Sequence, residues 1–238
     1  MQAAHETTKQ ANLPPYLKGE FFKALPAQAL ADFERLLSPP SAYPAGMVIF
    51  CETQPCSGVY VILEGEVKLS INSADGRRLS FRIARHGEVL GLSSTISGGP
   101  HQMTADALYP AKIAHIARSA FLEFLSRHPA AFQVVAQEMA RTYNVACEQL
   151  RMVGLSASVP ERLARLLLVW SGDRDHKPER PMHCRLSLTH EQIGEFIGAS
   201  RETVTRTLST FKSRHLVSQH GSILMIPSRV ALESYAGV

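Results

Sequence analysis

The sequence predicts an α+β protein of two domains, in which a small antiparallel β-barrel is followed by a long helix and a winged helix-turn-helix. Three observations support this order. Short β-rich runs alternate with turn residues between Ser41 and Ala117. An apolar stripe at helical spacing lies between Pro129 and Val153. Near the C-terminus, two short helical patterns joined by a tight turn precede a hairpin pattern.

The first part of the chain contains a tail, a helical stretch and the barrel. Residues 1–14 are polar and predict a mobile tail, and residues 15–128 are assigned to the barrel domain. Leu17 to Leu37 is amphipathic and helical, with an interruption at Pro26. Turns such as Ala74-Asp75-Gly76 separate the expected strands. These strands are Val48–Cys51, Val59–Leu63, Val67–Asn72, Leu79–Ala84, Gln102–Ala107 and Ala111–Ile116.

A long helix is predicted next, and residues 129–155 are assigned to it. Its apolar stripe advances in alternating steps of three and four residues, which is the spacing of a coiled-coil seam. We expect this helix to pair with a second copy of the chain. Burial of the stripe against the chain's own barrel is the alternative, and one helix can do both on different faces. The residues expected at the seam are Phe132, Val135, Met139, Ala146 and Val153.

The last domain, residues 156–238, begins at a hinge, Leu155 to Pro160, because the residue before a proline avoids helical conformation. Glu161 to Trp170 is expected to be helical, and Ser171 to Met182 a surface loop. Thr189 then predicts the start of a helix, since it can form a capping box with the Gln three residues later. Gly198 ends that helix.

The second helix of the motif begins at Ser200, and its first turns carry polar side chains on the face opposite Val204 and Leu208. Arg bridges guanine O6 and N7, Glu accepts from cytosine N4, and the Thr methyl touches thymine. This chemistry predicts a helix that reads base edges, whereas an intrahelical Glu202–Arg206 pair on a solvated face is the alternative. The wing is predicted around His220-Gly221, between Leu216 and Ile226. The residues expected to contact DNA are Thr189, Ser200, Arg201, Glu202, Thr205, Arg206, Lys212 and His220.

Composition restricts the function only loosely. The 238 residues are 45% hydrophobic with a net charge of +4, which suits a globular protein and is compatible with a polyanionic partner. The N-terminus lacks a basic-then-apolar signal, and no apolar run approaches the roughly 20 residues that span a bilayer, so we expect a cytoplasmic protein without membrane contact. The chain has no nucleophile elbow, P-loop or zinc-protease motif, so we expect no enzymatic activity.

The segment Ala199-Ser-Arg-Glu-Thr-Val-Thr-Arg206, followed by the wing, resembles the DNA-binding domain of the Crp/Fnr family of bacterial transcription regulators. Gly46–Phe50, Gly58–Leu69 and Gly87–Leu92 resemble, in that order, the strands and turns of the family's cyclic-nucleotide-binding-type β-roll. The resemblance extends from about Pro15 to about Ser228. It implies a homodimer that binds a palindromic site in double-stranded DNA, with RNA polymerase as a further partner. Arg201 favours a TGTGA-like half-site, since the type that reads TTGAT lacks an Arg there.

The resemblance also locates an effector pocket in the β-roll. Gly87 and Glu88 match the opening of the family's phosphate-binding cassette, in which the Glu holds the ribose hydroxyl. The family's cassette then supplies an Arg to the cyclic phosphate, but this chain has no Arg from Gly87 to Ala117. Without a guanidinium the phosphate loses a charge-assisted partner, which argues against cyclic AMP as the effector. The remaining polar candidates are Ser93, Ser94, Thr104 and Thr142, with His101 as a weak charge donor.

Other readings of the roll stay open. These residues can also be ordinary turn and strand residues, or they can hold a cyclic nucleotide through hydroxyls and backbone amides. The family also includes haem sensors, for which His86, His101 and His115 are candidate ligands, although no spacing favours any of them. No cysteine precedes Cys51, so no iron–sulfur cluster is expected, and no metal site is predicted. All four cysteines, Cys51, Cys56, Cys147 and Cys184, are expected to be structural thiols, and the alternative for Cys51 and Cys56 is a redox pair, because they are close in sequence. The alternative function class is a ligand-binding module that does not bind DNA, but that function would not explain the helix-turn-helix.

Overall fold

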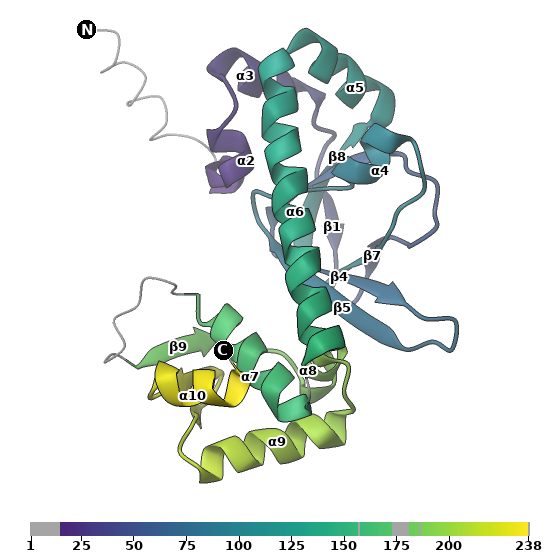
Figure 1. The fold of residues 1–238 in the computed structure, drawn as a ribbon. Coiled ribbons are helices and arrows are strands. Elements are labelled where there is room, and N and C mark those ends of the chain that lie inside the picture. The colour runs from purple at the N-terminus through teal and green to yellow at the C-terminus, as the bar shows by residue number, and fades with distance from the viewer. Residues whose placement is uncertain (1–14, 157, 173–180, 186, 238) are drawn as a thin grey trace, which may run out of the picture. The chain divides into compact units, whose positions relative to one another are not determined.

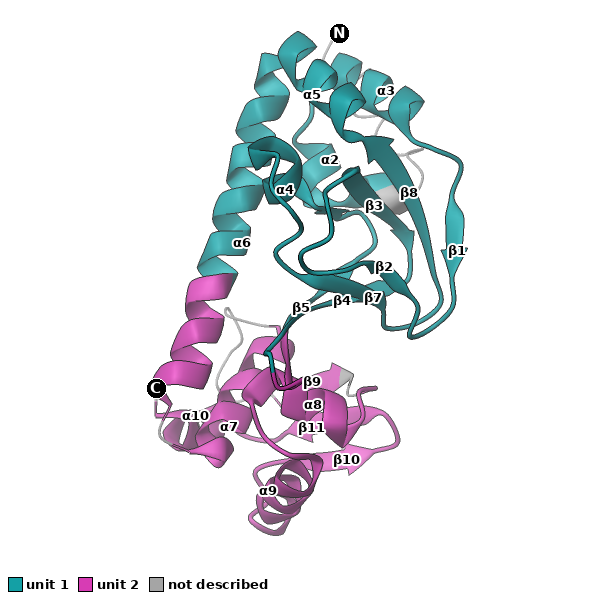
Figure 2. Ribbon diagram, turned by 90° about the vertical axis from the view of Figure 1, so that its right-hand side faces the viewer, with its two compact units in different colours: residues 1–74, 81–145 teal, residues 75–80, 146–238 magenta. Residues whose placement is uncertain are grey.

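The computed structural model describes residues 15–156, 158–172, 181–185 and 187–237 (Figure 1). The expected N-terminal tail, residues 1–14, lies outside the described residues. The chain divides into two compact units (Figure 2), one of residues 1–74 and 81–145, and the other of residues 75–80 and 146–238. Among the described helices, none combines the length and hydropathy needed to cross a membrane.

The first unit contains two four-stranded antiparallel sheets, which confirm the predicted β-roll. The strands of one sheet, in spatial order, are β1 (Ser41–Tyr43), β8 (Ala111–Ala117), β3 (Gly58–Glu64) and β6 (Val89–Leu90). Those of the other are β2 (Val48–Phe50), β7 (Thr104–Ala107), β4 (Glu66–Asn72) and β5 (Arg78–Arg85). The short strands β1 and β6 were not predicted, since three and two residues carry too little alternation to be recognised.

Helices supply much of the core of the first unit. They are η1 (Pro15–Lys18), α2 (Glu20–Lys23), α3 (Ala27–Leu36), α4 (Leu92–Ser97), α5 (Arg118–Arg127) and α6 (Pro129–Leu155). Phe33 of α3 is fully buried, and its ring centroid lies 5.4 Å from Phe22 and 5.4 Å from Phe124, with both rings nearly perpendicular to it. Such edge-to-face pairs contribute about 0.5–1.5 kcal/mol each beyond the burial of their area. Val59 and Val61 of β3 belong to the same core.

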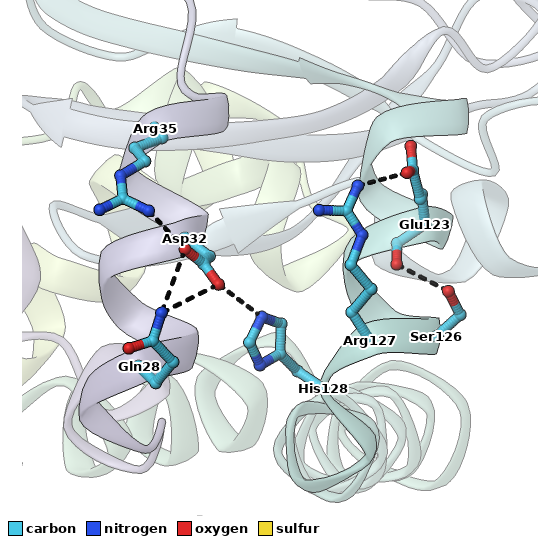
Figure 3. A network of polar contacts seen from close by, with 7 residues as sticks. All are labelled: Gln28, Asp32, Arg35, Glu123, Ser126, Arg127 and His128. Carbon is cyan, nitrogen blue, oxygen red and sulfur yellow. Dashed lines mark hydrogen bonds and ion pairs between the residues drawn. The ribbon is translucent and has the colours of Figure 1, made fainter.

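A polar network joins α3 to the junction between α5 and α6 (Figure 3). The Asp32 carboxylate accepts a hydrogen bond from Arg35 Nη1 at 2.8 Å, and its Oδ2 lies 3.0 Å from Nε2 of His128. The hydrogen bond from Gln28 lowers the pKa of Asp32, and the hydrogen bond from His128 and the positive charge of Arg35 lower it further. His128 is mostly buried, and its ring packs against that of Phe124. The carboxylate therefore links two helices that are distant in sequence.

The apolar stripe of α6 is divided between two faces of the helix. Val135 is 1% exposed and belongs to the core of its own roll, and Met139 packs against that core. Phe132, in contrast, is 48% exposed. The expectation that Val135 lies in a seam between two helices does not agree with its burial, so for this residue the structure supports the alternative of packing against the roll.

The second unit contains helices packed against a three-stranded sheet. The helices are α7 (Val159–Trp170), α8 (His190–Ile197), α9 (Arg201–Ser213) and α10 (Arg229–Ala236), and the sheet has the order β10 (Ser218–His220), β11 (Ile223–Ile226) and β9 (Met182–Arg185). Strands β10 and β11 confirm the predicted wing hairpin. Strand β9 begins at Met182, where the predicted surface loop was to end, and neither β9 nor α10 was predicted.

The end of α8 is held by side chains from other elements of this unit. Gln149 Nε2 donates to the carbonyl oxygens of Ser80, at 3.1 Å, and of Phe196, at 2.7 Å. Arg162 Nε donates to Ile197 O at 2.7 Å, and Ser80 Oγ donates to Glu195 Oε2 at 2.8 Å. The bonds to Phe196 O and Ile197 O satisfy carbonyl groups that a helix end otherwise leaves without partners.

Candidate nucleic-acid interface and cassette

The first helix of the motif begins as the sequence predicts. Thr189 Oγ1 accepts from the backbone N–H of Gln192 at 3.2 Å, and Gln192 Oε1 accepts from the backbone N–H of Thr189 at 2.9 Å, which completes the capping box. Gly198 ends α8 with φ 62° and ψ 47°, in the left-handed region that favours glycine. A Cβ at Gly194 would lie 2.3 Å from Ala199 O, so the tight turn needs a second glycine that the sequence reasoning had not identified.

The second helix, α9, separates an apolar face from a polar one. Ser200 caps it by accepting from the backbone N–H of Thr203 at 3.3 Å. Val204 is fully buried and Leu208 is 2% exposed, as the helical spacing predicts. The exposed side chains of its first turns are Arg201, Glu202, Thr205 and Arg206.

The charges on this face are available to a partner. No ion pair or hydrogen bond joins Glu202 to Arg206 in the described part of the chain, so the structure does not support the alternative of an intrahelical pair. The pKa of Glu202 is lowered, chiefly by a hydrogen bond from its own backbone N–H and then by Ser200, so the carboxylate is charged at neutral pH. Neither the Arg201 nor the Arg206 guanidinium forms a hydrogen bond or ion pair with another described residue. Both guanidinium groups therefore keep all their donors for a ligand.

Thr205 presents its methyl group, because its hydroxyl is already bonded within the protein. Thr205 Oγ1 donates to Arg201 O at 2.9 Å, and it lies 2.7 Å from Nδ1 of His190, the first residue of α8. A Thr whose hydroxyl is satisfied in this way offers an apolar contact to a thymine methyl rather than a hydrogen bond to a base edge. The sequence alone gave no signal for His190, which lies fifteen residues before Thr205.

The wing is attached to the end of α9 by one of the predicted DNA contacts. Lys212 Nζ donates to Gln219 Oε1 at 2.8 Å, and Gln219 Nε2 donates to Gly221 O at 3.1 Å. His220 is exposed at the end of β10. Lys212 therefore also positions the wing strand that carries His220, a role that the sequence did not reveal.

The cassette, residues 87–106 of the first unit, differs from the recognition helix because its acidic group already has partners. Glu88 Oε1 accepts from the backbone N–H of Arg85 at 2.8 Å, and Oε2 forms an ion pair with Nη1 of Arg82 on β5. Gly87 has φ 81°, and a Cβ on Gly19 would lie 2.1 Å from Gly87 O. The carboxylate that the family uses for a ribose hydroxyl is thus held by two groups of this chain.

Helix α4 follows within the cassette and was not predicted. Its N-terminal and C-terminal caps, Gly91 and Gly98, both adopt the left-handed conformation. Ser93 is exposed, and Ser94 is 5% exposed. The nearest Arg beyond the cassette, Arg118, donates from Nε to Thr95 O at 2.9 Å and so lies at the C-terminal end of α4.

The remaining cassette candidates are mostly buried or paired. The His101 ring stacks on Phe50 with centroids 4.0 Å apart, and burial lowers the pKa of His101. The lowered pKa favours the neutral imidazole at neutral pH, which argues against the expected role of His101 as a charge donor. Thr104 Oγ1 accepts from the backbone N–H of Glu52 at 3.0 Å. Thr142 is half-buried on α6 and forms no hydrogen bond to another described residue.

The histidines and cysteines of the roll show no clustering that would hold a metal. Among the described residues, no group of three or more His, Cys, Asp or Glu side chains is placed to bind a metal ion. His86 is exposed, whereas His115 Nε2 lies 3.2 Å from Ser57 Oγ, and burial lowers the pKa of His115. Cys51 and Cys56 are both free thiols, and Cys56 Sγ lies 3.3 Å from Thr95 Oγ1.

Comparison with known proteins gives matches in both units. Residues 161–235 match the family model of the Crp-like helix-turn-helix domain, and residues 40–128 match that of the cyclic nucleotide-binding domain. The CRP-like cAMP-activated global transcriptional regulator of Mycobacterium tuberculosis H37Rv is 27% identical over 212 residues, which cover 86% of this chain and 91% of that protein. The cAMP-activated global transcriptional regulator CRP of Escherichia coli O157:H7 is 23% identical over 185 residues, covering 77% and 87%.

Solved structures show the same fold. FixK2 from Bradyrhizobium japonicum matches with a TM-score of 0.71 at 23% identity, over 83% of this chain and 96% of that one. A CooA mutant from Carboxydothermus hydrogenoformans matches with a TM-score of 0.71 at 16% identity, over 85% and 88%. The protein is thus a transcription regulator with a cyclic nucleotide-binding domain and a helix-turn-helix. It belongs to the Crp/Fnr family, because the two domain models together match more than half of the chain in the family's order.

Proposed function

We propose that the protein binds a palindromic, TGTGA-like DNA site as a homodimer and that its roll senses a signal other than cyclic AMP. One observation carries the first part: Arg201 and Arg206 lie exposed on α9 without partners in the described chain, beside the charged Glu202. Guanidinium groups read guanine and a carboxylate reads cytosine, so this set suits base recognition better than phosphate contact alone. The proposed preference for a TGTGA-like half-site rests on the family resemblance.

The homodimer is proposed to form through the exposed face of α6. Phe132 is followed on this face by Ala136, Ala140 and Tyr143, all exposed, in steps of four, four and three residues. This is the spacing of a helix–helix seam, and small residues at its middle allow two backbones to approach closely. Two-fold pairing then places two recognition helices on two half-sites about one helical turn of DNA apart.

A neutral or weakly charged effector fits the cassette better than a cyclic phosphate does. Glu88 is engaged by Arg82, the pKa of His101 is lowered, and Arg118 is bonded to the carbonyl end of α4. A cyclic phosphodiester would therefore meet only guanidinium groups that already bond to this chain, although an unengaged guanidinium is the stronger kind of phosphate contact. The match to the cyclic nucleotide-binding domain keeps a cyclic-nucleotide response, through hydroxyls and backbone amides, as the second candidate.

Electrophoretic mobility shift at fixed salt tests the DNA-binding part. The duplexes are a palindrome of two TGTGA half-sites, a single half-site and a scrambled sequence. We expect a dissociation constant of about 10⁻⁸ M or tighter for the palindrome, with two protomers bound, and binding that is weaker by a factor of about 10³ or more for the scrambled duplex. Equal affinity for all three duplexes would contradict the proposal.

A further inference from the structure

His190 and Thr205 form a hydrogen bond, and the carbonyl oxygen of Arg201 fixes which of the two donates. The Thr205 hydroxyl has one proton, and it donates that proton to Arg201 O at 2.9 Å. The 2.7 Å contact between Thr205 Oγ1 and His190 Nδ1 must therefore be a hydrogen bond in which Nδ1–H donates and the hydroxyl oxygen accepts. The neutral imidazole of His190 then carries its only proton on Nδ1 and a lone pair on Nε2.

His190 is also placed where a helix-turn-helix meets the DNA backbone. It is the first residue of α8 and directly follows Thr189, and the first helix of such a motif crosses the phosphate chain. The ring is half-buried, and its Nε2 has no partner among the described residues. A lone pair on Nε2 repels a phosphate oxygen, whereas a protonated Nε2 donates a charge-assisted hydrogen bond to it.

We propose that His190 is a proton-coupled phosphate contact and the positioning residue for Thr205, so that binding of the regulator to its DNA site takes up protons. This inference rests on the proposed DNA-binding function. Nδ1–H holds the Thr205 hydroxyl and so keeps the methyl group toward the bases. Nε2 gains a proton when a phosphate arrives. Because each protomer of a dimer carries one His190, the protein–DNA complex takes up as many as two protons.

The charged groups nearest this pair lie on three helices. On α8 the neighbouring titratable residue is Glu191, and on α9 Thr205 is flanked by Arg201, Glu202 and Arg206. None of them is bonded to His190 in the described chain. On α7, which packs against both helices, Arg162 donates to Ile197 O, at the opposite end of α8.

The expected effect is a pH dependence of DNA affinity. If the complex prefers the protonated imidazole tenfold, affinity rises by up to about tenfold per protomer as the pH falls from 8 to 6. The measurement is the dissociation constant for the palindrome at pH 6, 7 and 8 and constant ionic strength. Calorimetry in buffers of different ionisation enthalpy counts the protons taken up.

His190→Asn is the decisive variant, because its amide N–H can replace Nδ1–H toward Thr205 but cannot be protonated. We expect it to bind like the unmodified protein at pH 8, to lose the gain at pH 6, and to keep its preference for thymine over uracil at the contacted position. The matched control is His215→Asn, at an exposed position after α9 that is not among the predicted DNA contacts, and it should keep the pH dependence. An unchanged pH profile in His190→Asn overturns the inference. Absence of sequence-specific binding at every pH would instead overturn the proposed DNA-binding function.

Discussion

The polar side chains of the cassette and those of the recognition helix differ in whether the protein itself provides their partners. In the cassette, Glu88 is bonded by Arg82 and by a backbone amide, and Thr104 accepts from the backbone of Glu52. On α9, Arg201 and Arg206 have no partner in the described chain. A group that already has a partner in the protein offers a ligand fewer donors or acceptors, or must give up a bond to hold it, whereas a solvated group has only to exchange water.

This difference indicates where each unit can bind strongly. The recognition helix retains its donors for an external polyanion, so its binding energy does not depend on rearrangement. The cassette can respond to a ligand only to the extent that the ligand binds one conformation better than another, because a shift in population is limited by the differential affinity. Substitutions of groups with and without partners in the protein therefore test this difference.

The two faces of α6 differ in the same way, because the apolar side chains of one face are buried in the roll and those of the other are exposed. Phe132→Glu places a charge on the exposed face, and we expect it to dissociate the dimer and abolish binding to the palindrome while the roll stays folded. Val135→Glu, at a 1% exposed position, should unfold the roll. Sedimentation and circular dichroism measure the two outcomes. Gln133→Glu, at an exposed position beside Phe132, is the control and should change neither.

A monomeric unmodified protein at micromolar concentration would contradict the prediction for α6. So would a Phe132→Glu variant that remains dimeric and binds the palindrome normally.

The second largest effect is expected from substitution of an exposed charged side chain on α9. Arg206→Ala should cost about 1–3 kcal/mol of binding free energy at the cognate site and relax the preference at one base pair. Competition assays with single-base variants of the palindrome measure both quantities, and the melting temperature should stay unchanged because the Arg206 guanidinium has no partner among the described residues. An equal loss of affinity for scrambled DNA would show that Arg206 contacts phosphate only.

Contacts between residues close in the sequence could be predicted, whereas contacts between distant residues could not. The capping box at Thr189 and the caps at Ser200 and Gly198 are built by residues within four positions of each other, so their pattern is visible in the sequence. The bond from Arg118 to Thr95 joins residues 23 positions apart, and that between His190 and Thr205 joins different helices. Such pairs depend on tertiary packing, which no local pattern encodes.

The error at Val135 has a geometrical cause. Residues three apart on an α-helix differ by about 60° around the axis, so an apolar stripe wide enough to face the roll also includes its neighbour on the outer face. Periodicity placed Phe132 and Val135 together, and only burial separates them. Strand β9 was missed because it pairs with β11, far along the chain, and its four residues alone give little signal.

A weaker effect is expected when the cassette is challenged with cyclic AMP. Titration to millimolar concentration should leave the affinity for the palindrome within a few-fold, because no unpaired guanidinium among the cassette groups meets the phosphate. Gln102→Arg supplies a guanidinium at an exposed cassette position and should increase calorimetric binding of cyclic AMP. Gln102→Lys is the control for charge without bidentate geometry. Micromolar binding by the unmodified protein, with a tenfold or larger gain in DNA affinity, would contradict the prediction.

The smallest effect is expected from Asp32, a carboxylate satisfied within the roll (Figure 3), in contrast to Glu202 on the recognition helix. The pKa of Asp32 is lowered in the folded protein, so its ionised form stabilises the fold at neutral pH, and this contribution is lost as the pH falls below the ordinary Asp value of about 3.9 and through the folded-state value. Asp32→Asn should therefore lower the melting temperature at pH 7, and the difference from the unmodified protein should shrink toward pH 3. Glu34→Gln, on the same helix but without a bonded partner, is the control, and neither change should alter DNA affinity. A melting-temperature difference that stays constant from pH 7 to pH 3 would show that the Asp32 charge does not stabilise the junction of α3 with α5 and α6.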